Sequence, residues 1–307
     1  MRISSSWAHQ TAVNSMLNQQ ASLQQIQQQL STGKKLLTPS DDPMAAARII
    51  DLNQNIKQNE QYQSNINTAR DRLSQQESVL QSATDVLQKI NELGVQGLND
   101  TNSPSDRTSI AGEMEELNKQ LLSIANTKSP SGEYLFSGFK STTQPFSKNS
   151  GTTGTYTYAG DTNSRSIQID TNRQITDGDP GSQVFGMPTG SATLPAAGSI
   201  NNVFEAIDKF AADLRANAPN SASLDDVSKS LDKVLSVRSS VGIRLNALDK
   251  QDEMHTDSVL EMKTVLSATE DVDYAEAIGR FSQQTVSLQA AQQTFTQLKK
   301  LSLFNYL

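Results

Sequence analysis

Residues 271–307 read DVDYAEAIGRFSQQTVSLQAAQQTFTQLKKLSLFNYL, and this stretch decides how the rest of the chain is arranged. Its apolar residues recur at spacings of three and four, which is typical of an amphipathic helix that packs against another helix. The row comprises Tyr274, Ala277, Ile278, Phe281, Leu288, Ala291, Phe295 and Leu298. Because tertiary packing supplies most of the stability of a helix in a protein, the pattern predicts a partner helix.

The N-terminal stretch, residues 5–31, supplies that partner. Met16, Leu23 and Leu30 form an apolar row spaced by seven, and Ala12, Gln19 and Ile26 fill a second row beside it. No Asp, Glu, Lys or Arg lies between residues 3 and 33 or between residues 281 and 298. A helix that faces water usually carries charge, and a buried amide costs far less than a buried unpaired charge. We therefore predict a coiled-coil pair whose outer face is covered by other subunits; a loosely ordered, glutamine-rich tail is the alternative.

Large apolar side chains also stand near both chain ends, where fraying is usual. They either pack onto the inner helices or dock on neighbouring molecules, and docking is favoured. The residues predicted to pack against other subunits or partners are Trp7, Met16, Leu23, Ile26, Leu30, Tyr274, Ile278, Phe281, Leu288, Phe295, Leu298, Leu303, Phe304 and Tyr306.

A hinge is predicted between the first helix and the next. Gly33 suits the left-handed conformation that ends a helix, and Pro39 lies in the turn that follows. Asp42 then reads as an N-cap, with Pro43 at the first helical position. A second hinge is expected at residues 268–273.

The inner part of the chain predicts long helices around a different central segment. Helices are expected at residues 43–98, 105–126, 202–216 and 224–266, and the two long ones carry heptad rows that predict their pairing. Residues 128–199 are rich in Gly, Pro, Ser and Thr, with strand-like alternation at 155–158 and 165–170. The predicted fold is mainly α, elongated, with a β-rich insert. Three domains follow: a terminal coiled coil (1–33 plus 270–307), a helical bundle (34–139 plus 200–269) and the insert (140–199).

Composition excludes several classes of function. The 307 residues carry a net charge of −7, so no basic surface is expected to bind nucleic acid. Cysteine is absent, which excludes disulfides and thiolate zinc sites. No stretch has the apolar length of a membrane span, and the N-terminus lacks the apolar core of a signal peptide. Export, if it occurs, is expected to use a route without a cleaved leader.

Candidate chemistry is sparse. The two histidines, His9 and His255, lie far apart on helical rows and read as packed residues rather than ligands. Asp161, Asp177 and Asp179 match no EF-hand spacing and read as turn residues. We therefore predict no catalytic site, no metal, no cofactor and no enzymatic activity.

Several motifs resemble the flagellin superfamily and, within it, the hook–filament junction proteins. They are LSTGK at 30–34, TPSDDP at 38–43, GEYLFSG at 132–138, VGIRLN at 241–246, EDVDYAEA at 270–277 and LSLFNYL at 301–307. The last of these is similar to the junction proteins rather than to flagellin itself.

The resemblance implies a non-enzymatic, secreted subunit of the bacterial flagellum that is exported unfolded by the flagellar type III apparatus. Implied partners are hook-associated protein 1, flagellin, copies of the chain in a ring and a dedicated export chaperone. Two other functions stay open: a flagellin that forms the filament, or an adhesin or glycan-binding module carried by the insert. Nothing functional is carried over to the insert.

Overall fold

The computed structural model describes residues 2–149, 156–190 and 193–300. The chain divides into two compact units: Met1–Gln58 with Asp257–Leu307, here called the terminal unit, and Asn59–Thr256, the inner unit. The boundaries fall inside two long helices, α2 (Pro43–Gly97) and α6 (Ser221–Glu270). The mainly helical class with a small β insert is confirmed, whereas the three-domain division stays a prediction.

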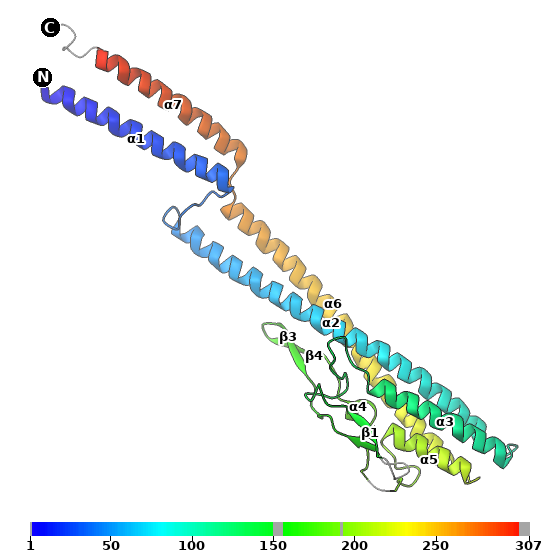
Figure 1. Ribbon diagram of the computed structural model, residues 1–307. Coiled ribbons are helices and arrows are strands. Elements are labelled where there is room, and N and C mark those ends of the chain that lie inside the picture. The colour runs from blue at the N-terminus through cyan, green and yellow to red at the C-terminus, as the bar shows by residue number, and fades with distance from the viewer. Residues whose placement is uncertain (1, 150–155, 191–192, 301–307) are drawn as a thin grey trace. The chain divides into compact units, whose positions relative to one another are not determined.

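In the terminal unit, α1 (Arg2–Thr32) and α7 (Tyr274–Lys300) lie side by side and antiparallel (Figure 1). This confirms the predicted pairing of the two ends. The seam between them is half-buried in the single chain, and it contains Met16, Leu23, Ile26, Leu30, Phe281, Leu288 and Phe295. Tyr274 and Ile278 were wrongly placed in this seam, because both side chains are more than half exposed. Ala277, another member of the predicted row, is buried, and so is Val272 just before α7.

The predicted end of the first helix and start of the second are confirmed. Gly33 has φ +72°, the left-handed conformation that ends α1. Asp42 Oδ1 accepts hydrogen bonds from the backbone N–H groups of Met44 (3.1 Å) and Ala45 (3.0 Å) at the start of α2. The second connection is shorter than predicted, because α6 continues to Glu270 and leaves only residues 271–273 outside a helix. Asp273 then caps α7 through the N–H groups of Ala275 and Glu276.

The inner unit is built on the heptad rows that the sequence predicted. Those of α2 (Ile66, Leu73, Leu80 and Leu87) and of α6 (Val227, Val234, Val241 and Leu248) are fully buried. Polar contacts also join the two helices, as when Arg238 Nε donates to Glu77 Oε1 (2.6 Å). Two shorter helices, α3 (Pro104–Ala125) and α5 (Val203–Arg215), pack against each other. Ser103 and Asp106 form a capping box that begins α3.

Within its described residues, the insert holds two separate two-stranded antiparallel sheets and a short helix, α4 (Gly181–Val184). β1 (Phe146–Lys148) pairs with β2 (Tyr156–Tyr158), and β3 (Ser166–Asp170) pairs with β4 (Arg173–Thr176). Strands therefore form at 156–158 and 166–170, within the two predicted segments, but their partners were missed. The missed strands β1 and β4 have three and four residues.

The apolar side chains of the insert belong to the same buried cluster as those of α2, α3, α5 and α6. At its centre Phe146 packs edge-on against Phe185 and Phe204, with ring centroids 5.7 Å and 5.1 Å away. Phe136 contacts Phe185 in the same manner at 5.2 Å. Because one cluster includes both helices and strands, the insert and the inner helices stabilise each other.

Candidate assembly surface

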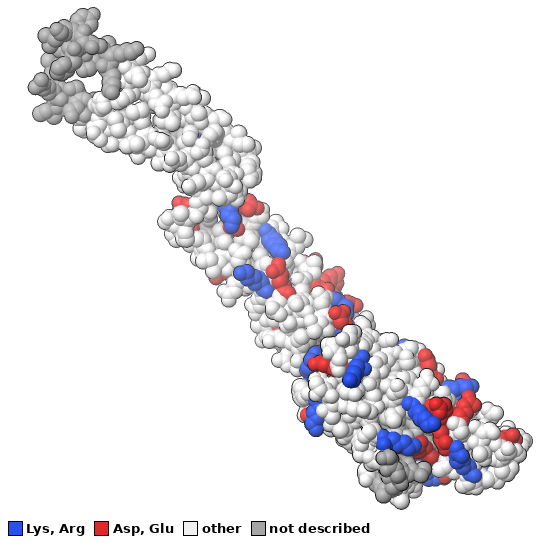
Figure 2. Space-filling view, in the orientation of Figure 1, with Lys and Arg blue, Asp and Glu red and all other residues white. Residues whose placement is uncertain are grey.

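The surface of α1 and α7 differs from that of the inner unit in its lack of charge. Figure 2 shows the viewed face of this helix pair almost free of blue and red, whereas both signs are interspersed over the inner unit. The same holds for every face of these stretches, because residues 3–33 and 281–298 contain no Asp, Glu, Lys or Arg. A surface of this kind is easily stripped of water by another protein, because no charge has to be desolvated.

Large apolar side chains stand out from this uncharged surface. Trp7, Leu17 and Val286 lie on the uncharged stretches and are more than half exposed, with Trp7 at 72%. Tyr274 and Ile278 are also more than half exposed, on either side of the charged Glu276. Single exposed apolar residues are ordinary, but several of them on an uncharged helix pair are typical of a protein interaction site. The surface therefore has the composition expected of one that is covered by other molecules.

Among the described residues, α1 and α7 line shallow grooves, of which two are the following. One is polar and uncharged, lined by Thr11, Asn14, Ser15, Asn18, Gln19, Ser22 and Gln284. The other is mainly apolar, lined by Val13, Met16, Leu17, Gln20, Leu288, Gln292, Phe295 and Thr296. The ring of His9 contacts that of Phe295 edge-on, with centroids 4.7 Å apart. Both grooves are open surfaces between helices, and neither contains a charged or thiol side chain to hold a cofactor.

The structure describes most of the residues predicted to pack against partners. Trp7, Tyr274 and Ile278 are exposed on the helix pair, and the seam residues are half-buried. The side chain of Leu298, and Leu303, Phe304 and Tyr306 entirely, lie outside the described residues. Pro39 and Asp42 are exposed in the connection between α1 and α2, and Pro43 is exposed as the first residue of α2. Their roles in partner binding and as a hinge stay predictions.

The described residues contain no group of three or more His, Cys, Asp or Glu placed to hold a metal ion. His255 is buried, and its ring nitrogens lie within hydrogen-bond distance of Asn59 Oδ1 (2.6 Å) and the Ile169 carbonyl (2.8 Å). It is a packed residue, as predicted. In the part of the chain described here, no helix is long and apolar enough to cross a membrane.

Two aspartates of the insert are anchors rather than simple turn residues. Asp177 is fully buried and accepts hydrogen bonds from Arg165 Nη2 (2.7 Å) and Nε (3.0 Å). Asp179 Oδ2 accepts from Arg244 Nη2 (2.5 Å) on α6 and from Gln76 Nε2 (2.8 Å) on α2. The contacts of Asp179 join the insert to the long helices, whereas the Arg165–Asp177 pair joins two parts of the insert. Asp161 does have the turn role that was predicted, because its Oδ1 accepts from the Asn163 N–H (2.8 Å).

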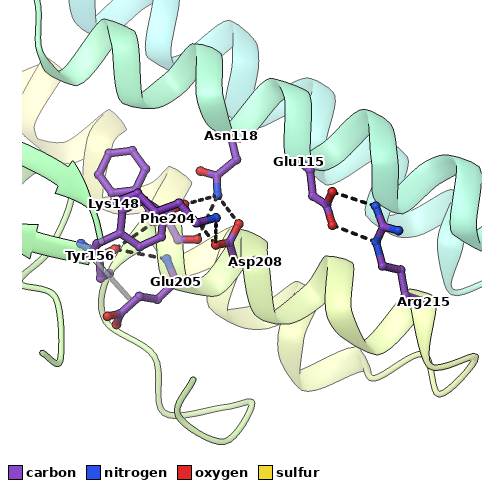
Figure 3. A network of polar contacts seen from close by, with 9 residues as sticks. Glu115, Asn118, Lys148, Tyr156, Phe204, Glu205, Asp208 and Arg215 are labelled. Atoms are coloured by element: carbon purple, nitrogen blue, oxygen red, sulfur yellow. Dashed lines mark hydrogen bonds and ion pairs between the residues drawn. The ribbon is translucent and has the colours of Figure 1, made fainter. Parts of the chain in front are cut away.

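A buried polar network around Asp208 was missed from the sequence (Figure 3). Asp208 on α5 accepts from Asn118 Nδ2 on α3 (2.8 Å), Lys148 Nζ on β1 (2.6 Å) and the Tyr156 hydroxyl on β2 (3.1 Å). Burial, reinforced by the nearby Asp208 carboxylate, raises the pKa of the Tyr156 hydroxyl, which therefore stays a donor. The network attaches the β1–β2 ribbon to the helices α3 and α5.

Glu205, beside this network, is expected to make the free energy of unfolding depend on pH. Burial raises the pKa of its carboxyl group above the ordinary 4.5, although Thr189 donates to it through N–H (3.1 Å) and Oγ1 (3.0 Å). Just above pH 4.5 the folded chain therefore holds a proton that the unfolded chain has released, so stability falls as pH rises towards the raised pKa. We expect Glu205→Gln to remove this loss of stability with rising pH. Urea unfolding at several pH values measures it, with the exposed Glu113→Gln on α3 as the control.

Comparison with known proteins adds independent information. Residues 3–141 match the model of the bacterial flagellin N-terminal helical region, and residues 224–307 match that of the C-terminal helical region. The chain is 34% identical over 318 residues to flagellar hook-associated protein 3 of Escherichia coli (strain K12), covering 99% of each. It is 32% identical to the protein of that name from Salmonella typhimurium (strain LT2), again over 99% of each.

A solved structure is similar as well. The structure of a putative flagellar hook-associated protein from Vibrio parahaemolyticus superposes with a TM-score of 0.65 at 26% identity. It covers 75% of this chain and 100% of that one. Since both flagellin helical regions match and the relatives align over almost their whole length, the chain belongs to the flagellin superfamily and, within it, to the family of flagellar hook-associated protein 3.

Proposed function

We propose that this chain is a structural, non-enzymatic subunit of the bacterial flagellum that forms an adaptor ring between hook-associated protein 1 and flagellin. The observation that carries the proposal is the alignment with proteins named flagellar hook-associated protein 3 over 99% of the chain. The uncharged helix pair α1–α7 supports it, because such a surface suits a shared wall between subunits.

A junction subunit has to meet different neighbours on its two axial sides. Its contacts are therefore heterologous, so one surface patch meets a different patch on the next molecule. An uncharged face with exposed apolar side chains such as Trp7 and Val286 can pack against different partner surfaces, because it requires no complementary charge pattern on the partner. We infer that copies of the chain cover this face around the ring, and hook-associated protein 1 and flagellin above and below it.

The proposal includes the route to the assembly site. The subunit is exported unfolded through the flagellar type III apparatus, after a dedicated chaperone has held its C-terminal region, and it acts outside the cell. The absence of cysteine suits a chain that has to unfold, pass and refold, since no disulfide has to be broken or formed.

A deletion strain tests the function. Cells without the gene are expected to keep their hooks, to secrete flagellin monomer into the medium and to lose motility, and the full chain supplied in trans is expected to restore filaments. Normal filaments in the deletion strain would contradict the proposal. Purified protein separates it from the alternative, because a flagellin elongates into long filaments on its own seeds, whereas an adaptor stops after a ring.

A further inference from the structure

The seam between α1 and α7 does not by itself determine how the two helices align along their length. Coiled coils usually set their register with charged pairs beside the seam or with a hydrogen-bonded polar residue inside it. Residues 3–33 and 281–298 have no charge. Gln19 lies in the seam, but its Oε1 is buried without a hydrogen-bond partner among the described residues. Another feature has to set the register.

If α1 slipped by one heptad along α7, each apolar side chain of the seam would face another apolar side chain of similar kind. Met16, Leu23 and Leu30 on α1 are spaced by seven, as are Phe281, Leu288 and Phe295 on α7. A slip of seven residues moves one helix by about 10 Å along the other while keeping apolar groups opposite apolar groups. The contact of His9 with Phe295 is one ring pair far from the hinge, and a slip would bring Met16 to Phe295 instead.

The chain passes twice between the two helix pairs, once after α1 and once between α6 and α7, and backbone hydrogen bonds join these two segments. The N–H of Lys35 donates to the carbonyl of Glu270 (2.6 Å), and the N–H of Val272 donates to the carbonyl of Gly33 (2.9 Å). Lys34 and Asp271 form the antiparallel bridge between these bonds. The side chains of Lys34 and Glu270 add an ion pair. Residues 33–35 and 270–272 are called the joint below.

No flexible linker separates the joint from α1 or α7. Gly33 directly follows α1, and its N–H donates to the carbonyl of Gln29 (2.9 Å). The buried Gln29 side chain donates in turn to the carbonyl of Lys35 (2.8 Å). On the other side, Asp273 caps α7 one residue after Val272. A heptad slip would therefore have to break both backbone hydrogen bonds of the joint.

We propose that the joint fixes the register of α1 against α7. Gln29, Gly33 and Val272 are positioning residues: they hold the two helices at one end, and the seam closes from there. The register decides which side chains face the outside of the pair, so the joint also decides what a neighbouring subunit meets. Only this last consequence rests on the proposed function; the register itself is a property of the single chain.

Distance measurements between spin labels test the proposal on the purified full chain. The natural sequence has no cysteine, so Gln25→Cys with Gln283→Cys places labels only on α1 and α7, at exposed positions. The parent should give one narrow distance peak. Val272→Pro removes the N–H donor of the joint and should broaden that peak or add one for a pair shifted by about 10 Å along the axis. Glu270→Gln removes only the ion pair and should broaden the peak less.

Two control variants make the result specific. Val272→Ala keeps the N–H and truncates the side chain, and Glu261→Gln neutralises an exposed carboxylate elsewhere on α6; both should keep the parental peak. An unchanged peak in Val272→Pro would overturn the proposal, and so would several peaks in the parent or equal broadening in Val272→Ala. The readout needs no assembly, so its failure is distinct from failure of the adaptor function.

Discussion

Replacing Phe204 with alanine is expected to lower the free energy of unfolding of the inner unit by about 3–5 kcal/mol. The Phe204 side chain is fully buried and its ring packs against those of Phe146, Tyr156 and Phe185, at centroid distances between 5.1 and 5.8 Å. Truncation leaves a cavity at the point where α5, the β1–β2 ribbon and α4 meet. These elements come from distant parts of the sequence, so none of them relaxes easily to fill the space.

Phe139→Ala is the matched control, because it makes the same chemical change at a side chain that is 59% exposed. It is expected to change stability by no more than about 0.5 kcal/mol. Urea unfolding followed by far-UV circular dichroism measures both variants. The single tryptophan, Trp7, lies in the terminal unit, so its fluorescence does not follow this core. Equal losses in the two variants would show that the aromatic cluster is not the core of the inner unit.

The helices were predictable because their signals are local and repeated. Ile66, Leu73, Leu80 and Leu87 repeat the same spacing over six turns of α2, and all four are fully buried. Helix ends were predictable for a related reason, since Gly33 and the Asp42–Pro43 pair act within one turn of their own position. Ala277, which lies between Tyr274 and Ile278 in the same predicted row, is fully buried, so the phase of the row was right although these two members stay more than half exposed.

The polar contacts that hold the insert could not be predicted, because their partners are far apart in the chain. Asp208 binds Lys148 and Asn118, which precede it by 60 and 90 residues. No spacing rule links such positions. The burial of Asp208 had one weak signal, since it lies between Ile207 and Phe210 in the apolar half of a strongly amphipathic helix. The uncharged surface of α1 and α7 could be predicted, because the absence of charged residues is visible in the sequence itself.

Val286→Asp tests whether that neutral surface is covered in the assembly. Val286 is 65% exposed on α7, so in the single chain the new carboxylate stays in water and folding should be unaffected. If a neighbouring subunit covers the site, the charge is buried without a partner, which costs roughly 3–5 kcal/mol. At about 1.4 kcal/mol per factor of ten, incorporation should fall more than a hundredfold. Motility in soft agar and the amount of variant in purified flagella measure the loss in a complemented deletion strain.

Val286→Asn is the decisive control, because asparagine has nearly the shape of aspartate and no charge. It should support assembly far better, since a buried amide costs much less and can hydrogen-bond to a neighbour. Both variants have to appear in the culture medium, so that a loss reflects incorporation rather than export. If both assemble normally, this part of α7 faces water in the flagellum. If both fail equally, shape at the interface rather than charge excludes them, and the argument from the neutral face would be wrong at this position.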